Sequence, residues 1–188
     1  MKSVLKHWPW VALFSSLLML AIAHAFETFG RMAPCELCLK ERQIYWLAAG
    51  IAAVGMVSIR GHDAYIAAQL SHANEPERYK YRVPGLTALS TPLALVFLGG
   101  AALAAYHAGA EWEFWPGPAS CTGAHVQVNA ADLARLLNGG PIAVPACDKP
   151  AWVFLGISMA GWNALISMQL AVFSALAAWR GFSEARAR

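Results

Sequence analysis

Two long apolar segments of this chain meet at residues 34–42, Pro34-Cys35-Glu36-Leu37-Cys38-Leu39-Lys40-Glu41-Arg42. If a helix begins at Leu37, Cys38 lies in its first turn, where unpaired backbone N–H groups and the helix dipole favour an anion. Arg42 follows four residues later, on the same face of that helix. Both effects favour the thiolate of Cys38, which is the reactive form of cysteine. The Cys-x-x-Cys pair is therefore a candidate redox site, although such a pair also occurs as half of a zinc site or as a structural disulfide.

The composition is that of a membrane protein. Of its 188 residues, 58% are hydrophobic and only 13% are charged, whereas soluble domains carry about 25% charged residues. So few charges cannot cover a soluble surface, and we expect one integral membrane domain over residues 1–188. No run of Lys and Arg suggests a nucleic-acid partner, so the expected surroundings are the lipid bilayer.

Four apolar stretches are each close to the roughly 20 residues that span a bilayer, and they predict transmembrane helices at about 8–26, 43–59, 86–108 and 152–179. The first ends in Ala23-His24-Ala25, which resembles a signal-peptidase site, but the run is longer than a signal h-region. We expect it to be retained, with cleavage as the alternative. Tyr45 and Trp46 are suited to an interfacial aromatic belt at the start of the second span.

The placement of Lys and Arg predicts the orientation. With both termini cytoplasmic, nine of the fourteen basic residues lie inside, as the positive-inside rule favours. The outer loops are then 27–42 and 109–151, and the inner loop is 60–85. The expected fold is an all-α, four-transmembrane-helix bundle. Asn129 can cap a short membrane-surface helix at about 130–137 in the second outer loop.

In this orientation all four cysteines, Cys35, Cys38, Cys121 and Cys147, lie on the outer face, which is oxidising. The spacing of the loop pair is wrong for a zinc ribbon, so no metal is expected, although a Cys₄ zinc site and two structural disulfides remain alternatives. The functional interpretation is a relay, in which a loop disulfide exchanges with the pair at residues 35 and 38.

A relay needs a terminal acceptor. Cys38 lies at the mouth of the predicted bundle, where a hydrophobic quinone can reach it from the lipid. Arg42 can hold a quinone oxygen and stabilise the nearby thiolate. The alternative for Arg42 is an interfacial arginine that contacts a lipid phosphate.

With these features the chain resembles the DsbB family, the bacterial inner-membrane quinone-linked disulfide oxidases. The resemblance covers nearly the whole chain. It includes four spans, Cys-x-x-Cys followed by Glu-Arg at the second span, and two cysteines in a long second outer loop. It also includes Cys147-Asp148-x-Pro150-x-Trp152, Phe154-Leu155-Gly156 and Trp162. The inner loop 60–85 is longer than the family pattern suggests.

The resemblance implies a role for each cysteine. Cys121 would be attacked by a reduced, DsbA-like thioredoxin-fold protein of the periplasm, and Cys147 would exchange with Cys35. Cys38 would meet ubiquinone or menaquinone from the membrane pool and form a thiolate–quinone charge-transfer species, with Arg42 beside it. The implied location is the bacterial inner membrane, with the cysteine loops facing the periplasm.

Other polar residues of the spans are less specific. His107 lies at the outer end of the third span, where family members place a polar residue near the quinone, although an interfacial histidine there is equally ordinary. We interpret Glu41, Asn163 and Gln169 as structural, with the two amides hydrogen-bonded between helices.

Two other classes compete with this interpretation. A vitamin K epoxide reductase-like enzyme also joins a thioredoxin-like partner to a quinone, but its quinone-facing Cys-x-x-Cys comes after the loop pair, and here it comes first. A non-catalytic membrane protein with two structural disulfides would have inert, fully oxidised cysteines.

Overall fold

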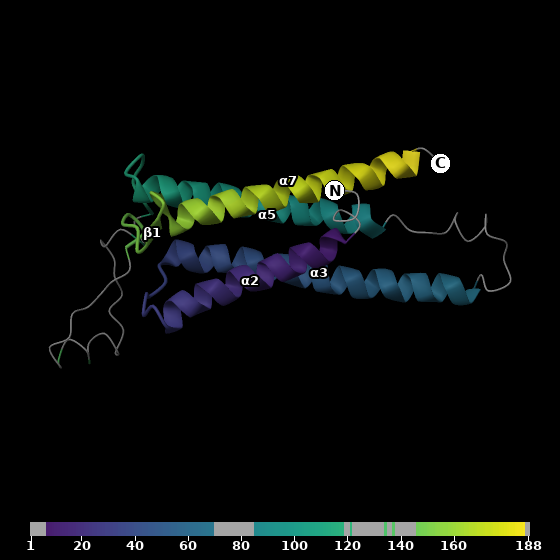
Figure 1. Ribbon diagram of the computed structural model, residues 1–188, viewed down its shortest axis with the longest axis horizontal. Helices are drawn as coiled ribbons and strands as arrows, with labels where there is room; N and C mark the ends of the chain where they lie inside the picture. The colour runs from purple at the N-terminus through teal and green to yellow at the C-terminus, as the bar shows by residue number, and fades with distance from the viewer. Residues whose placement is uncertain are drawn as a thin grey trace.

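The computed structural model describes residues 7–69, 85–118 and 146–186, together with Cys121, Ala134 and Leu137. These parts contain long helices and one small hairpin, in the order α2 (Trp8–Thr28), α3 (Glu36–Gln69), α5 (Gly85–Glu111), β1 (Val153–Phe154), β2 (Ile157–Ser158) and α7 (Met159–Arg186). α5 packs most extensively on α7, α2 packs on α3, and α3 joins the two pairs through α5. Figure 1 shows the resulting elongated bundle, with α5 and α7 on one side and α2 and α3 on the other.

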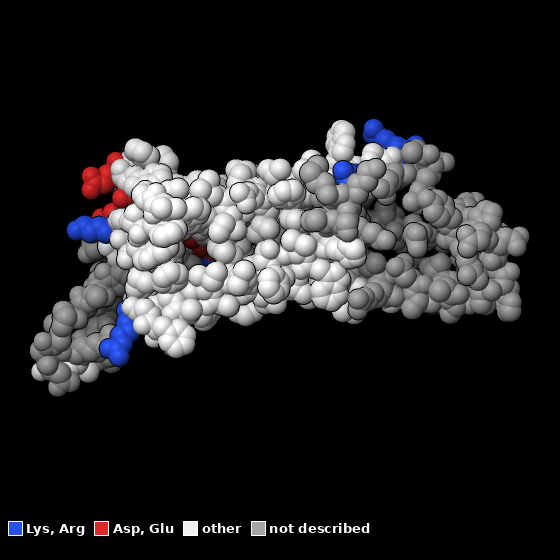
Figure 2. Space-filling view, viewed as in Figure 1, with Lys and Arg blue, Asp and Glu red and all other residues white. Residues whose placement is uncertain are grey.

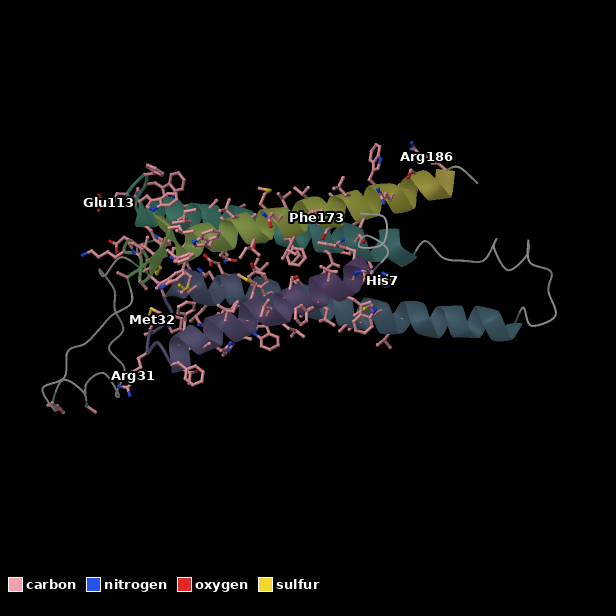
Figure 3. The ribbon with its side chains drawn as sticks, in the orientation of Figure 1. His7, Arg31, Met32, Glu113, Phe173 and Arg186 are labelled. Atoms are coloured by element: carbon pink, nitrogen blue, oxygen red, sulfur yellow. A yellow bond between two sulfur atoms is a disulfide. The ribbon has the colours of Figure 1, made fainter. Side chains whose placement is uncertain are left out.

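The two ends of the bundle differ in what they carry. His7, just before α2, and Arg186, at the end of α7, lie toward one end in Figure 3, whereas Arg31, Met32 and Glu113 lie at the other. The β-hairpin is at this second end (Figure 1). The connection between α2 and α3, the end of α5 and the start of α7 therefore meet at one end of the molecule.

The surface between these ends is apolar. Charged side chains gather toward the ends in Figure 2, and the length between them is almost free of charge, apart from atoms in one hollow. Among the described residues, three stretches are long and apolar enough to cross a membrane: Trp8–Thr28, Ala88–Glu111 and Met159–Ser183. The helical membrane bundle predicted from the sequence agrees with these findings. The span at 43–59, which lies within α3, and the cytoplasmic termini remain predictions.

Small side chains allow the helices to approach closely. Ala12, Ala48, Ala52, Ala171 and Ala177 are buried in the main core, around larger side chains that include Leu93 and Phe97. Small residues at helix interfaces are typical of membrane bundles, where packing rather than the hydrophobic effect holds helices together. One buried hydrogen bond links the first and last helices: the Trp8 indole Nε1–H donates to Ser174 Oγ over 2.8 Å.

The fourth helix begins later than the sequence predicted. Residues 153–154 and 157–158 pair as antiparallel strands, and the turn residues Leu155 and Gly156 have φ angles of 52° and 76°. Two consecutive positive φ angles are typical of a tight hairpin turn and are incompatible with a right-handed helix. The predicted helical start at Trp152 is therefore wrong, and α7 begins at Met159.

Three further expectations concern segment boundaries and faces. α3 continues past 59 to Gln69, residues 70–84 of the predicted inner loop lie outside the described residues, and Gly85 already belongs to α5. Of the predicted surface helix at 130–137, only Ala134 and Leu137 are described, both in helical conformation, and its Asn129 cap lies outside the described residues. Tyr45 is buried in the core rather than at the interface, because it faces α5 and α7, whereas Trp46 is exposed.

Candidate redox site

The four cysteines come together at the hairpin end of the bundle. Cys35, Leu37, Cys121 and Cys147 form one buried cluster, with Cys38 packed against it. Cys121 and Cys147 are joined by a disulfide, and the free thiols of Cys35 and Cys38 lie 2.7 Å apart. The sulfur atoms of Cys35 and Cys147 lie within 4.8 Å of each other. A modest movement would therefore bring the two pairs into contact for thiol–disulfide exchange.

The helix terminus acts on Cys35 rather than on Cys38. α3 begins at Glu36, so Cys35 occupies the N-cap position, and its sulfur accepts a hydrogen bond from the backbone N–H of Cys38 over 3.2 Å. The hydrogen bond from the Cys38 thiol, followed by backbone N–H groups of Cys38 and Leu37, lowers the pKa of Cys35. The same hydrogen bond, together with burial, raises the pKa of Cys38. In the dithiol form Cys35 therefore gives up its proton more readily than Cys38.

His107 lies directly beside this cysteine pair. Its Nε2 atom is 3.6 Å from Cys35 Sγ, and its Nδ1 atom is 2.8 Å from Glu41 Oε1. A carboxylate only accepts hydrogen bonds, so Nδ1 carries a hydrogen and donates a hydrogen bond to Glu41. This fixes the ring so that Nε2 faces the sulfur. His107 is only 3% exposed, and α5 thereby presents a base to the start of α3.

Glu41 is the centre of a polar network between α3 and α7. Its second oxygen accepts a hydrogen bond of 2.5 Å from Asn163 Nδ2. Asn163 Oδ1 in turn accepts one from the Tyr45 hydroxyl, which also lies 2.9 Å from Ser167 Oγ. The predicted interhelical bonding is confirmed for Asn163. The same prediction is wrong for Gln169, whose side chain is exposed on α7.

A cavity of about 330 Å³ opens beside the network, and Figure 2 shows a hollow with acidic and basic atoms near this end of the bundle. Cys38, Glu41, Arg42, His107 and Glu111 form its polar side. Its other walls are apolar and aromatic, from α2, the hairpin and α7, and they include Leu20, Phe26, Trp152, Phe154, Trp162 and Ile166. Apolar walls with a few converging polar groups are typical of a small-molecule site.

Arg42 lines the same cavity as Cys38, but its described hydrogen bonds are with residues of α2. Its guanidinium donates to Glu27 Oε2 over 2.5 Å and to the Ala23 carbonyl over 3.1 Å, both on α2. Its side chain is 15% exposed. The sequence placed Arg42 next to the Cys38 thiolate. The two side chains share the cavity, while the hydrogen bonds of Arg42 anchor it to α2.

Sequence reasoning overlooked Glu111. It lies one turn after His107 on α5, is 9% exposed, and has one oxygen 3.9 Å from His107 Nε2. Among the described residues, its Oε2 atom has no hydrogen-bond partner. The spacing His107-x-x-x-Glu111 places both on one helix face and was a usable signal. Three residues of metal-ligating type, Cys35, His107 and Cys147, also lie close together. Cys147 is bonded to Cys121, however, and is not a thiolate ligand.

Comparison with known proteins gives the family. Residues 6–177 match the family described as Disulfide bond formation protein DsbB. The chain therefore belongs to the DsbB family, as the resemblance predicted, and the family implies a membrane oxidoreductase of disulfide bond formation, generally linked to quinone. No curated protein matches the chain significantly.

Proposed function

We propose that this protein is a quinone-dependent thiol–disulfide oxidoreductase that reoxidises a DsbA-like, thioredoxin-fold dithiol protein and passes two electrons to membrane quinone. One observation carries the proposal: Cys35 lies within 4.8 Å of Cys147 of the loop disulfide, while its neighbour Cys38 lines an apolar cavity. The two pairs thus form a continuous route from an outer loop to a site that a lipid-soluble acceptor can enter.

The route consists of two exchange steps. A partner thiolate attacks Cys121, and Cys147 leaves as a thiolate. Cys147 then attacks Cys35 of an oxidised Cys35–Cys38 pair, and Cys38 leaves as a thiolate. Each step breaks one S–S bond and forms another, and the two electrons that are passed along come from the reduced partner.

The electrostatics of Cys38 change during this sequence. In the dithiol, the hydrogen bond between the two sulfur atoms lowers the pKa of Cys35 and raises the pKa of Cys38. Once Cys35 is bonded to Cys147, it no longer competes for the charge. The Cys38 thiolate then lies at the cavity wall that also contains His107 and Arg42. The exchange therefore delivers a thiolate to the acceptor only after the loop pair has reacted.

The residues around the cavity fit a quinone. The flat rings of Phe26, Trp152 and Phe154 offer apolar surfaces, and Arg42 offers N–H donors for a carbonyl oxygen, while His107 lines the same cavity. Ubiquinone or menaquinone would supply the acceptor chemistry, taking up two electrons and two protons. Cys38 would donate the electrons, and Arg42 would hold one quinone oxygen.

The proposed location is the bacterial inner membrane, with both termini cytoplasmic and the cysteine end facing the periplasm. The positive-inside distribution of Lys and Arg supports this orientation. So does the arrangement in Figure 3, in which His7 and Arg186 both lie away from the end that holds Arg31 and Glu113. A disulfide relay also needs an oxidising compartment.

The test is quinone reduction in detergent. Purified protein receives ubiquinone and a reduced thioredoxin-like dithiol protein, and the quinone absorbance is followed. Wild type is expected to consume quinone catalytically, Cys38→Ser to consume none, and Ser183→Ala, on the far part of α7, to match wild type. Absence of quinone reduction with several dithiol proteins and both quinone classes would contradict the proposal and favour a protein with structural disulfides only.

A further inference from the structure

We propose that Glu111 is the acid–base group that connects His107 to the cavity. In this assignment, which rests on the proposed function, the proton that leaves Cys35 passes to His107, then to Glu111, and from there to the quinone. Glu41 acts through His107 and is a positioning residue.

The environment of Glu111 points to a ligand. The residue is 9% exposed and lines the cavity, and among the described residues its Oε2 atom has no hydrogen-bond partner. A buried carboxyl oxygen without a partner is costly, so in native proteins such atoms usually meet water or a ligand. The Ser158 hydroxyl lies beside the same carboxyl group. Glu111 is thus held in place while one oxygen is left for an occupant of the cavity.

One atom of His107, Nε2, lies near both the group that gives up the proton, Cys35, and the group that receives it, Glu111. Nε2 lies 3.6 Å from Cys35 Sγ and 3.9 Å from Glu111 Oε1. Nδ1 cannot serve, because its proton is engaged by Glu41 over 2.8 Å. The nitrogen that can take a proton from the thiol is therefore the one that can pass it to Glu111. Small side-chain movements would shorten both distances to hydrogen-bond length, as is common when a substrate binds.

No other described acid or base offers the same connection. Both Glu41 oxygens already accept hydrogen bonds, from His107 and Asn163. Arg42 is a permanent cation whose guanidinium is bonded to α2. The titratable or charged side chains that line the cavity with Glu111 are Cys38, Glu41, Arg42 and Tyr45 on α3 and His107 on α5, whereas the polar groups described there on β2 and α7, Ser158 and Asn163, are neutral.

The path completes the balance of the reaction. When Cys35 and Cys38 form their disulfide, two S–H bonds break, one S–S bond forms, and two electrons and two protons leave. A quinone that becomes a quinol gains the same two electrons and two protons at its oxygens. Cys38 lines the cavity and can deliver its proton there directly. The Cys35 thiol is buried behind it, so its proton needs the route through His107 and Glu111.

The test compares Glu111→Gln with the matched control Glu113→Gln, which changes an exposed glutamate of the same region. At pH 7, Glu111→Gln is expected to reduce quinone roughly 100-fold more slowly than wild type, a typical effect of losing a general acid or base. Glu111→Asp keeps a carboxyl group and is expected to be at least about tenfold faster than Glu111→Gln. Equal rates for the Gln and Asp variants, or a wild-type rate for Glu111→Gln, would overturn the assignment.

A second readout needs no quinone. An infrared difference spectrum is recorded between the reduced protein and the protein oxidised by a small disulfide. Wild type and Glu113→Gln are expected to show a carboxyl band that Glu111→Gln lacks, and persistence of that band in Glu111→Gln would overturn the assignment. Failure of wild type to reduce quinone would instead contradict the proposed function, and the infrared result would still report on Glu111.

Discussion

Replacing Glu41 with glutamine tests whether the buried network orients His107. The two Glu41 oxygens accept hydrogen bonds of 2.8 Å from His107 Nδ1 and 2.5 Å from Asn163 Nδ2, and the residue is 8% exposed. Glutamine keeps one acceptor and places an NH₂ group where the second acceptor was. One buried donor then faces another donor.

The magnitude follows from those two contacts. Hydrogen bonds to a charged group contribute about 1.5–3 kcal/mol each, and a buried donor left unpaired costs about 1–3 kcal/mol. We expect Glu41→Gln to lower the free energy of unfolding by about 3 kcal/mol, measured by SDS titration in detergent. Because His107 loses its fixed orientation, quinone reduction should also slow, roughly 100-fold.

Two further variants make this prediction refutable. Glu36→Gln removes an exposed ion pair with Lys40, whose side chains are 40% and 50% exposed, and should change stability by less than about 1 kcal/mol. Adding Asn163→Asp to Glu41→Gln restores an acceptor opposite the new NH₂ group, so the double variant should be more stable than Glu41→Gln. A Glu41→Gln protein with wild-type stability, or a double variant no more stable than the single one, would mean that these hydrogen bonds do not hold the network together.

Three more predictions follow from individual contacts. Ser174→Ala leaves the Trp8 indole N–H without its acceptor and should cost about 1–3 kcal/mol in the same unfolding assay; an unchanged midpoint would mean that the bond contributes nothing. The pKa of Cys35 is lowered. As the pH falls below the pKa of an ordinary cysteine, Cys35 therefore stays a thiolate until the pH passes its own pKa. In the reduced, quinone-free protein, alkylation followed by mass spectrometry should therefore modify Cys35 at lower pH than Cys38, and the reverse order would contradict the N-cap assignment. Arg42→Gln should raise the KM for quinone about tenfold with little change in kcat, as expected for loss of a binding contact; an unchanged KM would leave Arg42 with only its contacts to α2.

The sequence predicted what depends on composition and order along the chain. Apolar runs indicated the helices, and the order of the cysteine pairs, with the Glu-Arg that follows the first, indicated the family. These signals depend on short stretches of sequence or on their order along the chain, so they can be recognised without a structure. The placement of all four cysteines at one end also followed, because alternating spans fix which loops are neighbours.

What the sequence did not predict depends on single-residue shifts and on contacts between distant segments. A helix start at Glu36 instead of Leu37 moves the N-cap interaction to Cys35. The apolar run that begins at Trp152 is typical of a helix, but the positive φ angles of the hairpin turn show that its first residues are not helical. The connections of Glu111 depend on how helices pack, which hydropathy does not encode.

In the proposed function, electrons from a dithiol protein leave through Cys38 to a quinone. The most direct measurement is stoichiometric and is made without oxygen: a limiting amount of ubiquinone is added to the protein with excess reduced thioredoxin-like dithiol protein. The disulfides formed in the dithiol protein and the quinone consumed are then both counted. We expect one disulfide for each quinone with wild type and none with Cys38→Ser. Disulfide formation that continues after the quinone is exhausted, or that persists in Cys38→Ser, would contradict the proposed function.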